Sequence, residues 1–258
     1  MIVSCYPRSG SSWFVRVLAD ALGLYLTNKD ESYINEGYSS RYEKAKALSE
    51  KRKVAFIDKS HYESFEKTRL INMNLDNKFV FLYRDPRDAI LSYFYFVFYR
   101  QKKVSRKIAL EYLKRFQLKK YMTLVSGQFD KVTFEDFFYT FVIHEIKRWK
   151  NYYAEWTGRE NVLTLRYESI VNNTKKNVKQ VAAFLNIDHN EDDIRKSIEQ
   201  WSLENTKKAF KDTSLKKEER MVRTAKFGEW KDKFNQKTID LFDSEFKSLE
   251  DVLYEDQK

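Results

Sequence analysis

The residues best suited to chemistry lie near the start of the chain, in the run Arg8, Ser9, Gly10, Ser11, Ser12 and Trp13. An apolar run precedes them and apolar residues at helical spacing follow, which predicts a strand, a short loop and the start of a helix. Backbone N–H groups and the positive end of a helix suit a phosphate at such a place. Arg8 adds a bidentate charge, the serines add hydroxyl donors, and Gly10 permits a close backbone approach. The alternative is an ordinary strand–helix turn with a serine cap.

Three more residues with chemically useful side chains follow predicted strands, namely His61, Arg84 and Tyr167. Ligands of parallel α/β sheets bind beyond the carboxyl ends of the strands, so we expect these residues to gather near Arg8. An imidazole and fixed positive charge beside a phosphate loop would provide proton transfer and anion binding. Taken singly, each residue has a plainer interpretation. Arg84 could pair locally with Asp85, and the aromatic rings could belong to the core.

The elements that must position these residues alternate between short apolar strands and amphipathic helices. We predict strands over residues 1–6, 53–57, 78–83 and 161–166. Helices are predicted over residues 14–21, 87–96, 104–125, 134–157, 174–185, 190–200 and 235–253. This alternation is typical of an α/β fold with a mostly parallel sheet flanked by helices. Since no stretch rich in Pro, Gly or Ser forms a linker, we expect a single domain over residues 1–258.

The composition limits the class of protein. With 48 basic and 38 acidic residues, the net charge of +10 suits an anionic ligand or nucleic acid, or reflects a lysine-rich surface. The one cysteine, Cys5, provides no disulfide framework and fits a reducing compartment. We find no signal peptide, no membrane-spanning run, and no His, Cys, Asp or Glu cluster with metal-ligand spacing. These observations favour a cytoplasmic protein with neither a metal nor a membrane partner.

Four separated segments give the chain a resemblance to a known family. They are residues 6–13, residues 59–61 (Lys-Ser-His), residues 83–93 (beginning Tyr-Arg-Asp-Pro-Arg-Asp) and residues 223–231 (Arg-Thr-Ala-Lys-Phe-Gly-Glu-Trp-Lys). In type and order they resemble the motifs of the sulfotransferases that use 3′-phosphoadenosine 5′-phosphosulfate (PAPS), most closely the soluble cytosolic type. The resemblance implies a P-loop-like nucleotide fold of the sulfotransferase type, PAPS as the sulfuryl donor and adenosine 3′,5′-bisphosphate (PAP) as its product.

The resemblance also implies a nucleotide site. Residues 8–13 would bind the 5′-phosphosulfate, while Trp13 and Tyr167 would stack on the adenine. The 3′-phosphate and its surroundings would be held by residues of the third and fourth segments: Arg84, Ser92, Arg223, Thr224 and Ala225. Two of these depart from the family pattern, because Thr224 and Ala225 stand where the family usually has lysine and glycine.

For catalysis, the resemblance implies that His61 is the general base that takes the proton of the acceptor. Lys59 and Arg8 would supply positive charge where the leaving phosphate develops negative charge during an in-line displacement. The family usually has lysine at the position of Arg8, and arginine keeps only an electrostatic role because it does not give up its proton. The expected acceptor is a small molecule with a hydroxyl or an amine. The expected assembly state is a monomer or a homodimer, because the family's dimerisation signature is not recognisable here.

Two other functions compete with this one. A P-loop nucleotide kinase needs Gly-x-x-x-x-Gly-Lys-Ser/Thr, and the loop here has one glycine and no such lysine. A non-catalytic protein that binds nucleotides or nucleic acid would use the positive charge without chemistry, but no nucleic-acid motif is apparent. We therefore expect a small-molecule acceptor as the partner, and no nucleic acid.

Overall fold

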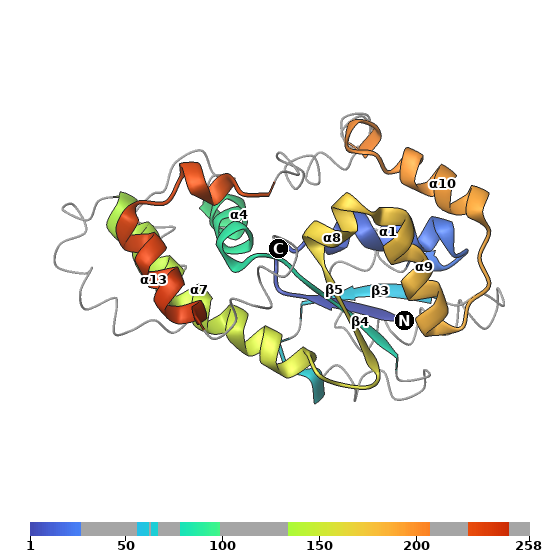
Figure 1. The fold of residues 1–258 in the computed structure, drawn as a ribbon, viewed down its shortest axis with the longest axis horizontal. Helices are drawn as coiled ribbons and strands as arrows, with labels where there is room; N and C mark the ends of the chain where they lie inside the picture. Colours follow the sequence, from blue (N-terminus) through green and yellow to red (C-terminus); the bar gives the residue numbers. More distant parts are fainter. Residues whose placement is uncertain (27–55, 62, 67–77, 99–133, 207–226, 248–258) are drawn as a thin grey trace. The chain divides into compact units, whose positions relative to one another are not determined.

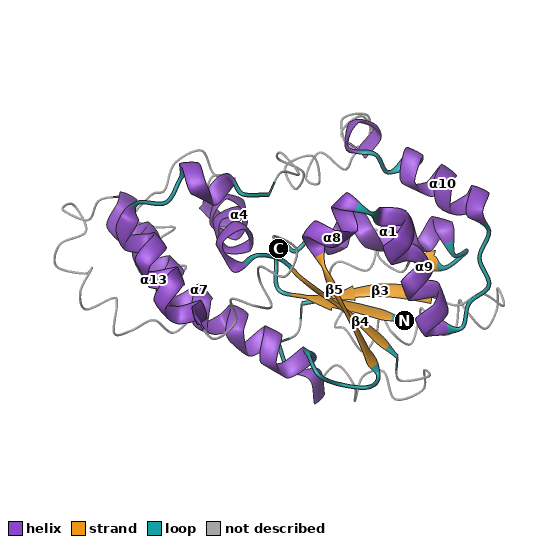
Figure 2. Ribbon diagram, in the orientation of Figure 1, coloured by secondary structure: helices purple, strands orange, loops and turns teal. Residues whose placement is uncertain are grey.

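In the computed structural model, the described part of the chain comprises residues 1–26, 56–61, 63–66, 78–98, 134–206 and 227–247 (Figure 1). The chain divides into two compact units, residues 1–84 with 151–225 and residues 85–150 with 226–258. The first unit carries the sheet, whereas the elements described in the second are helices (Figure 2). No described helix is both long enough and apolar enough to cross a membrane.

The sheet of the first unit is parallel. Its strands are β1 (Ile2–Cys5), β2 (Tyr25–Leu26), β3 (Phe56–Ser60), β4 (Phe79–Tyr83) and β5 (Val162–Arg166). They lie in the order β2-β3-β1-β4-β5, and the ladders that join them are parallel. This confirms the predicted α/β class. Because β3 lies on one side of β1 and β4 on the other, the switch point of the topology falls at the end of β1, where ligands of such sheets bind.

Helices cover the sheet from the side of β1 that carries Val3 and Cys5. They are α1 (Ser11–Ala21), α8 (Tyr167–Asn172), α9 (Thr174–Leu185) and α10 (Glu191–Gln200). α1 packs on β1, β3 and α10, and its buried residues share one apolar core with Val80 and Leu82 of β4. The side chains of Asn173 and Asn190 cap the first turns of α9 and α10, which fixes where these helices begin.

The other face of the sheet is aromatic. Phe79 and Phe81 alternate with Val80 and Leu82 along β4, so their side chains project from the opposite face. The ring of Trp156 stacks on Phe81 with 5.9 Å between ring centroids and 11° between ring planes. Trp156 also meets Phe79 edge-on at 5.9 Å. This indole is fully buried, so both faces of the sheet are covered in the first unit, as the sequence predicts.

The second unit is a helical cluster held by aromatic contacts. It contains α4 (Pro86–Phe98), the residues up to 150 of α7 (Phe134–Trp156), the short 3-10 helix η5 (Glu229–Asp232) and α13 (Gln236–Phe246). Phe94 of α4 meets Phe138 and Phe141 of α7 edge-on, with centroids 4.8 and 5.2 Å apart. Phe234 and Phe242 stack at 5.3 Å. Phe138 and Phe141, on the helix predicted over residues 134–157, are therefore core residues.

The structure corrects one strand and adds three short elements. The predicted strand over residues 53–57 is wrong at its carboxyl end, because β3 continues to Ser60. The cause is tertiary: Asp58, Lys59 and Ser60 pair in register with Ile2, Val3 and Ser4 of β1, and this ladder outweighs their low strand propensity. The added elements are β2, α8 and η5, none of which was predicted. The predicted helix over 104–125 lies outside the described residues, as do residues 248–253 of the last predicted helix.

Candidate active site

The loop between β1 and α1 has an unusual backbone. Arg8 and Gly10 both have left-handed conformations, with φ of 74° and 83°. Glycine adopts this conformation without strain, whereas arginine does so rarely, and such strain gathers at functional sites. The hydrogen bonds of the loop include one from Ser9 N to Tyr6 O at 3.3 Å and one from Arg84 Nη1 to Arg8 O at 3.3 Å. The loop is therefore held from the end of β4.

The start of α1 is built to receive an anion. Gly10 is the N-cap and has no side chain to cap the helix, and the first turn contains no acidic residue. The first N–H groups of a helix have no acceptor within the helix, so they add to the positive end of its dipole. In addition, Ser9 Oγ is fully buried and has no hydrogen-bond partner among the described residues. A buried hydroxyl of this kind fits a phosphate oxygen, whereas an ordinary structural turn would satisfy it.

Lys59 reaches the same helix start from the neighbouring strand. Its Nζ donates to Ser12 Oγ at 2.8 Å, and its side chain is partly buried. The pairing of Lys59 with Val3 in the β1–β3 ladder places it one strand away from the loop. The extension of β3 beyond its predicted end is thus what brings this ammonium group to the predicted phosphate site.

His61 follows β3 directly and lies against the end of β1. Its Nδ1 is 3.1 Å from the Cys5 carbonyl oxygen and 3.3 Å from Cys5 Sγ. The hydroxyl of Tyr152 donates a hydrogen bond to the main-chain oxygen of His61. Among these residues Cys5 and Tyr152 are fully buried, whereas His61 is exposed. The imidazole is therefore anchored on its Nδ1 side and accessible to solvent.

The Cys5 thiol is not a nucleophile. Burial raises its pKa to about 11, because the low-dielectric core disfavours the thiolate more than Ser11 and Lys59 stabilise it. Its Sγ donates to Ser11 Oγ at 3.0 Å. Cys5 thus acts as a protonated structural group between the first residue of α1 and His61.

Arg84 and Tyr167 form a second group at the loop. The guanidinium carbon of Arg84 lies 4.7 Å from the centre of the Tyr167 ring, and both side chains are buried. The same ring lies against Gly10, where an added Cβ would overlap with Cδ2 and Cε2 of the ring. Glycine at position 10 is therefore required both by its φ and by the close approach of Tyr167.

Trp13 is fixed by the chain segment after α10. Its Nε1 donates to Trp201 O at 2.7 Å, and Trp201 Nε1 donates to Asp20 Oδ2 at 2.6 Å. A ring that stacks on a base needs an accessible face. Trp13 is partly exposed, whereas Tyr167 is only 6% exposed. The adenine-stacking role of both residues stays a prediction.

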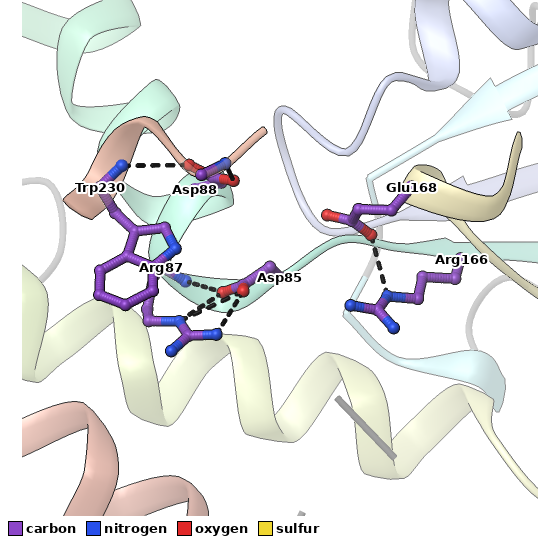
Figure 3. Close-up of polar contacts among 7 residues, drawn as sticks. Asp85, Arg87, Asp88, Arg166, Glu168 and Trp230 are labelled. Carbon is purple, nitrogen blue, oxygen red and sulfur yellow. Dashed lines mark hydrogen bonds and ion pairs between the residues drawn. The ribbon is translucent and has the colours of Figure 1, made fainter. Parts of the chain in front are cut away.

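In the second unit, the beginning of α4 holds the 228–230 turn (Figure 3). The Asp88 carboxylate accepts hydrogen bonds from the backbone N–H groups of Gly228 and Trp230. The Arg87 guanidinium lies 4.0 Å from the centre of the Trp230 ring and pairs with Asp85, with 2.6 Å between Nη2 and Oδ2. The third and fourth predicted segments therefore share a network of hydrogen bonds and ring contacts. The Asp85 charge, which could have paired with Arg84 alone, is balanced by Arg87.

Figure 3 also shows an ion pair that belongs to the first unit. Arg166 Nε, at the end of β5, donates to Glu168 Oε2 at 3.1 Å, and both side chains are mostly buried. This pair brackets Tyr167 in sequence and fixes the turn from β5 into α8. It therefore helps to place the Tyr167 ring over Gly10.

The structure brings together most, but not all, of the predicted site. Lys59 contacts Ser12 at the start of α1, and Arg84 contacts both Arg8 and Tyr167. Tyr167 lies against Gly10, and His61 contacts the end of β1. Ser92 lies on α4 of the second unit. The predictions for Arg223, Thr224 and Ala225 lie outside the described residues. Two residues at the site were missed: Cys5, which was interpreted only as a sign of a reducing compartment, and Tyr152, which no motif marks.

Comparisons with known proteins identify the family and the fold of the chain. A family model described as "Sulfotransferase domain" matches residues 1–253. A structure of mouse sulfotransferase SULT7A1 complexed with PAP is 20% identical, with a TM-score of 0.66, over 96% of this chain and 82% of that one. A retinol dehydratase in complex with androsterone and PAP is 18% identical, with a TM-score of 0.57, over 96% and 79%. No curated protein matches the sequence. At these identities the two structures show a shared fold.

Proposed function

This chain belongs to the sulfotransferase domain family, and on that premise we propose that it moves a sulfuryl group from PAPS to a hydroxyl or amine of a small-molecule acceptor. The products are PAP and a sulfate ester or sulfamate. The observation that carries the proposal is the contact of Lys59 with the first turn of α1, where Lys59 Nζ lies 2.8 Å from Ser12 Oγ. We further propose that the whole chain, residues 1–258, acts as one sulfotransferase domain, in line with the family match over residues 1–253.

The donor would bind at the start of α1. Its 5′-phosphosulfate carries negative charge, and the helix dipole, the buried Ser9 hydroxyl and the Lys59 ammonium all favour an anion there. Two solved structures of similar fold are complexes with PAP, which supports the same nucleotide for this chain. The adenine would stack on Trp13 and Tyr167, which is a role assigned by family resemblance.

Arg84 is the first candidate for the 3′-phosphate that distinguishes PAPS from ATP. It is buried, lies on the Tyr167 ring and bonds to the loop backbone, so its guanidinium has little freedom to lose on binding. Ser92 and Arg223 would complete the phosphate contacts, with Thr224 and Ala225 next to them. These last four assignments rest on sequence motifs alone.

The reaction would be an in-line displacement at sulfur. The acceptor oxygen or nitrogen forms a bond to sulfur while the bond from sulfur to the bridging phosphate oxygen breaks, and the acceptor's proton passes to His61. The negative charge left on the phosphate would be stabilised by Lys59, by the N-terminus of α1 and by Arg8. Arginine stays protonated, so Arg8 contributes charge and no proton.

The proposed acceptor is a class of small molecule rather than one compound. In two solved structures of similar fold, retinol dehydratase is bound to androsterone or to retinol, so that protein binds an apolar alcohol. The sequence offers Tyr95, Phe96, Phe98 and Tyr99 as candidates for an apolar wall around the acceptor. We propose a small hydroxyl- or amine-bearing molecule, acted on in the cytoplasm, where a lone thiol such as Cys5 stays reduced.

A screen with PAPS tests this function. The full chain is incubated with PAPS and a panel of phenols, aliphatic alcohols and amines, and mass spectrometry detects a mass gain of one sulfuryl group together with release of PAP. We expect at least one acceptor to be modified, and modification to require PAPS. A chain that binds PAP but modifies no acceptor class would instead be a non-catalytic nucleotide-binding protein.

A further inference from the structure

The surroundings of His61 determine which of its nitrogens carries the proton. Nδ1 lies 3.1 Å from the carbonyl oxygen of Cys5. A carbonyl oxygen can only accept a hydrogen bond, so this short contact is favourable only when Nδ1 is the protonated nitrogen. In a neutral imidazole the lone pair then resides on Nε2.

The Cys5 side chain favours the same tautomer. Its Sγ is 3.3 Å from His61 Nδ1 and 3.0 Å from Ser11 Oγ, to which it donates. With the thiol proton directed at Ser11, sulfur presents lone pairs to His61 and can only accept from Nδ1. Because burial keeps this thiol protonated, with its pKa at about 11, the arrangement holds across the neutral pH range.

The main chain of His61 is also held in place, by a residue of α7. The Tyr152 hydroxyl donates to the His61 carbonyl oxygen, and Tyr152 itself is fully buried. Its ring meets Tyr6 edge-on, with centroids 5.7 Å apart and planes at 89°. Tyr6 lies at the start of the loop between β1 and α1. Tyr152 therefore contacts both His61 and the loop that would bind the donor.

We propose that Cys5 and Tyr152 are positioning residues that hold His61 with its proton on Nδ1, so that Nε2 is the atom that takes the acceptor's proton. This inference rests on the proposed role of His61 as the base. In the reaction the acceptor's O–H or N–H proton passes to Nε2 and the new bond forms at sulfur. The resulting imidazolium keeps its Nδ1–H bond to the Cys5 carbonyl, which offsets part of the cost of charging the ring.

The tautomer can be measured without any turnover. In protein with ¹⁵N-labelled histidine, two-dimensional NMR at a pH about two units above the ordinary imidazole pKa of about 6.5 distinguishes a protonated Nδ1 from a protonated Nε2. The His61 signals are assigned by their loss in His61→Ala, since His144 and His189 are the two other histidines. We expect Nδ1–H and an unprotonated Nε2. A predominant Nε2–H form would overturn the proposal.

Kinetics of two variants test the positioning roles. In Cys5→Ala the ring loses the sulfur contact, so we expect kcat to fall about tenfold with an unchanged KM for PAPS, and a fraction of Nε2–H to appear in the NMR spectrum. Cys5→Ser keeps an atom that can donate to Ser11 and accept from His61, and should recover most of kcat. Tyr152→Phe should lower kcat in the same way, whereas Tyr153→Phe, one position along the helix, should not.

Failure of this inference can be told apart from failure of the proposed function. If Cys5→Ala folds and retains both wild-type kcat and the wild-type tautomer, the positioning role of Cys5 is wrong although sulfuryl transfer stands. If His61→Ala transfers at the wild-type rate, His61 is not the base and the functional assignment fails, whatever the tautomer. Thermal unfolding of each variant identifies a loss of kcat that comes from misfolding.

Discussion

At the residue scale, two side chains from the end of β3 have separate tasks. Lys59 bonds to Ser12 and faces the start of α1, while His61 is anchored to Cys5 and exposed on its other side. This separation predicts separate effects on binding and on chemistry. A group that binds the donor should alter affinity for the nucleotide, and a base should alter only the transfer step.

For His61→Ala we expect transfer to fall by about 10²–10⁴-fold, the usual contribution of a general base. PAP affinity should stay the same, because a general base acts on the acceptor's proton in the transfer step and not on the bound nucleotide. Product formation and calorimetric titration with PAP measure the two quantities. Transfer that survives in this variant would remove His61 from the mechanism.

Arg8 offers a second test at this scale, because its predicted role needs only charge. Arg8→Ala should lower kcat by about 10²–10³-fold, as the loss of one charge-stabilising group does at other reaction centres. Arg8→Lys keeps the charge and restores the residue that the family usually has, so activity should stay within a few-fold of wild type. Equal loss in both variants would show that the guanidinium geometry matters rather than the charge.

At the scale of elements, the loop between β1 and α1 depends on contact between Gly10 and Tyr167. In Gly10→Ala the new Cβ would overlap the Tyr167 ring, and φ at this position is 83°. We expect unfolding to become easier by about 1–3 kcal/mol, the typical cost of a strained local conformation, with more lost if the ring cannot move.

Gly158→Ala is the matched control for this change. Its φ of 73° is similar, but nothing lies within 4 Å of an added Cβ. Denaturant unfolding of both variants should therefore show a larger loss for Gly10→Ala, and the difference between them isolates the close approach of Tyr167. Equal losses would mean that only the backbone conformation matters at position 10.

A pH-dependent contact joins α9 to α10. Glu191 pairs with Lys175, at 2.6 Å, and with Lys179, and these bonds lower the pKa of its carboxyl from 4.5 to about 2. Because the folded-state pKa lies below the unfolded one, the pair stabilises the fold above about pH 4.5, and this contribution is lost as the pH falls towards 2.

Glu191→Gln should therefore unfold slightly more easily than wild type at pH 7, and the gap should narrow as the pH falls from about 4.5 towards 2. The effect is small, because the group is fully exposed and salt screens it. Unfolding of both proteins at several pH values measures the difference. A gap between the two proteins that did not narrow over this pH range would contradict the ion pair as its cause.

At the scale of the whole molecule, the sequence predicts the elements better than the contacts between them. The strands β1, β4 and β5 begin and end within two residues of their predicted bounds, because each is a short apolar run with clear boundaries. β3 was misplaced because its polar residues extend the strand only through pairing with β1, which is a long-range interaction. The site's charged residues carried motif signals, whereas Cys5 and Tyr152 act through tertiary contacts that no local pattern encodes.

The identity of the nucleotide is the central prediction for this protein. Calorimetric titration of the full chain with PAP and, separately, with ATP tests it without knowledge of the acceptor. By family resemblance, Arg84, which is buried beside the β1–α1 loop, would recognise the 3′-phosphate that ATP lacks. We expect PAP to bind at least about tenfold more tightly than ATP, which corresponds to about 1.4 kcal/mol. Equal affinities, or tighter binding of ATP, would contradict a PAPS-dependent sulfotransferase.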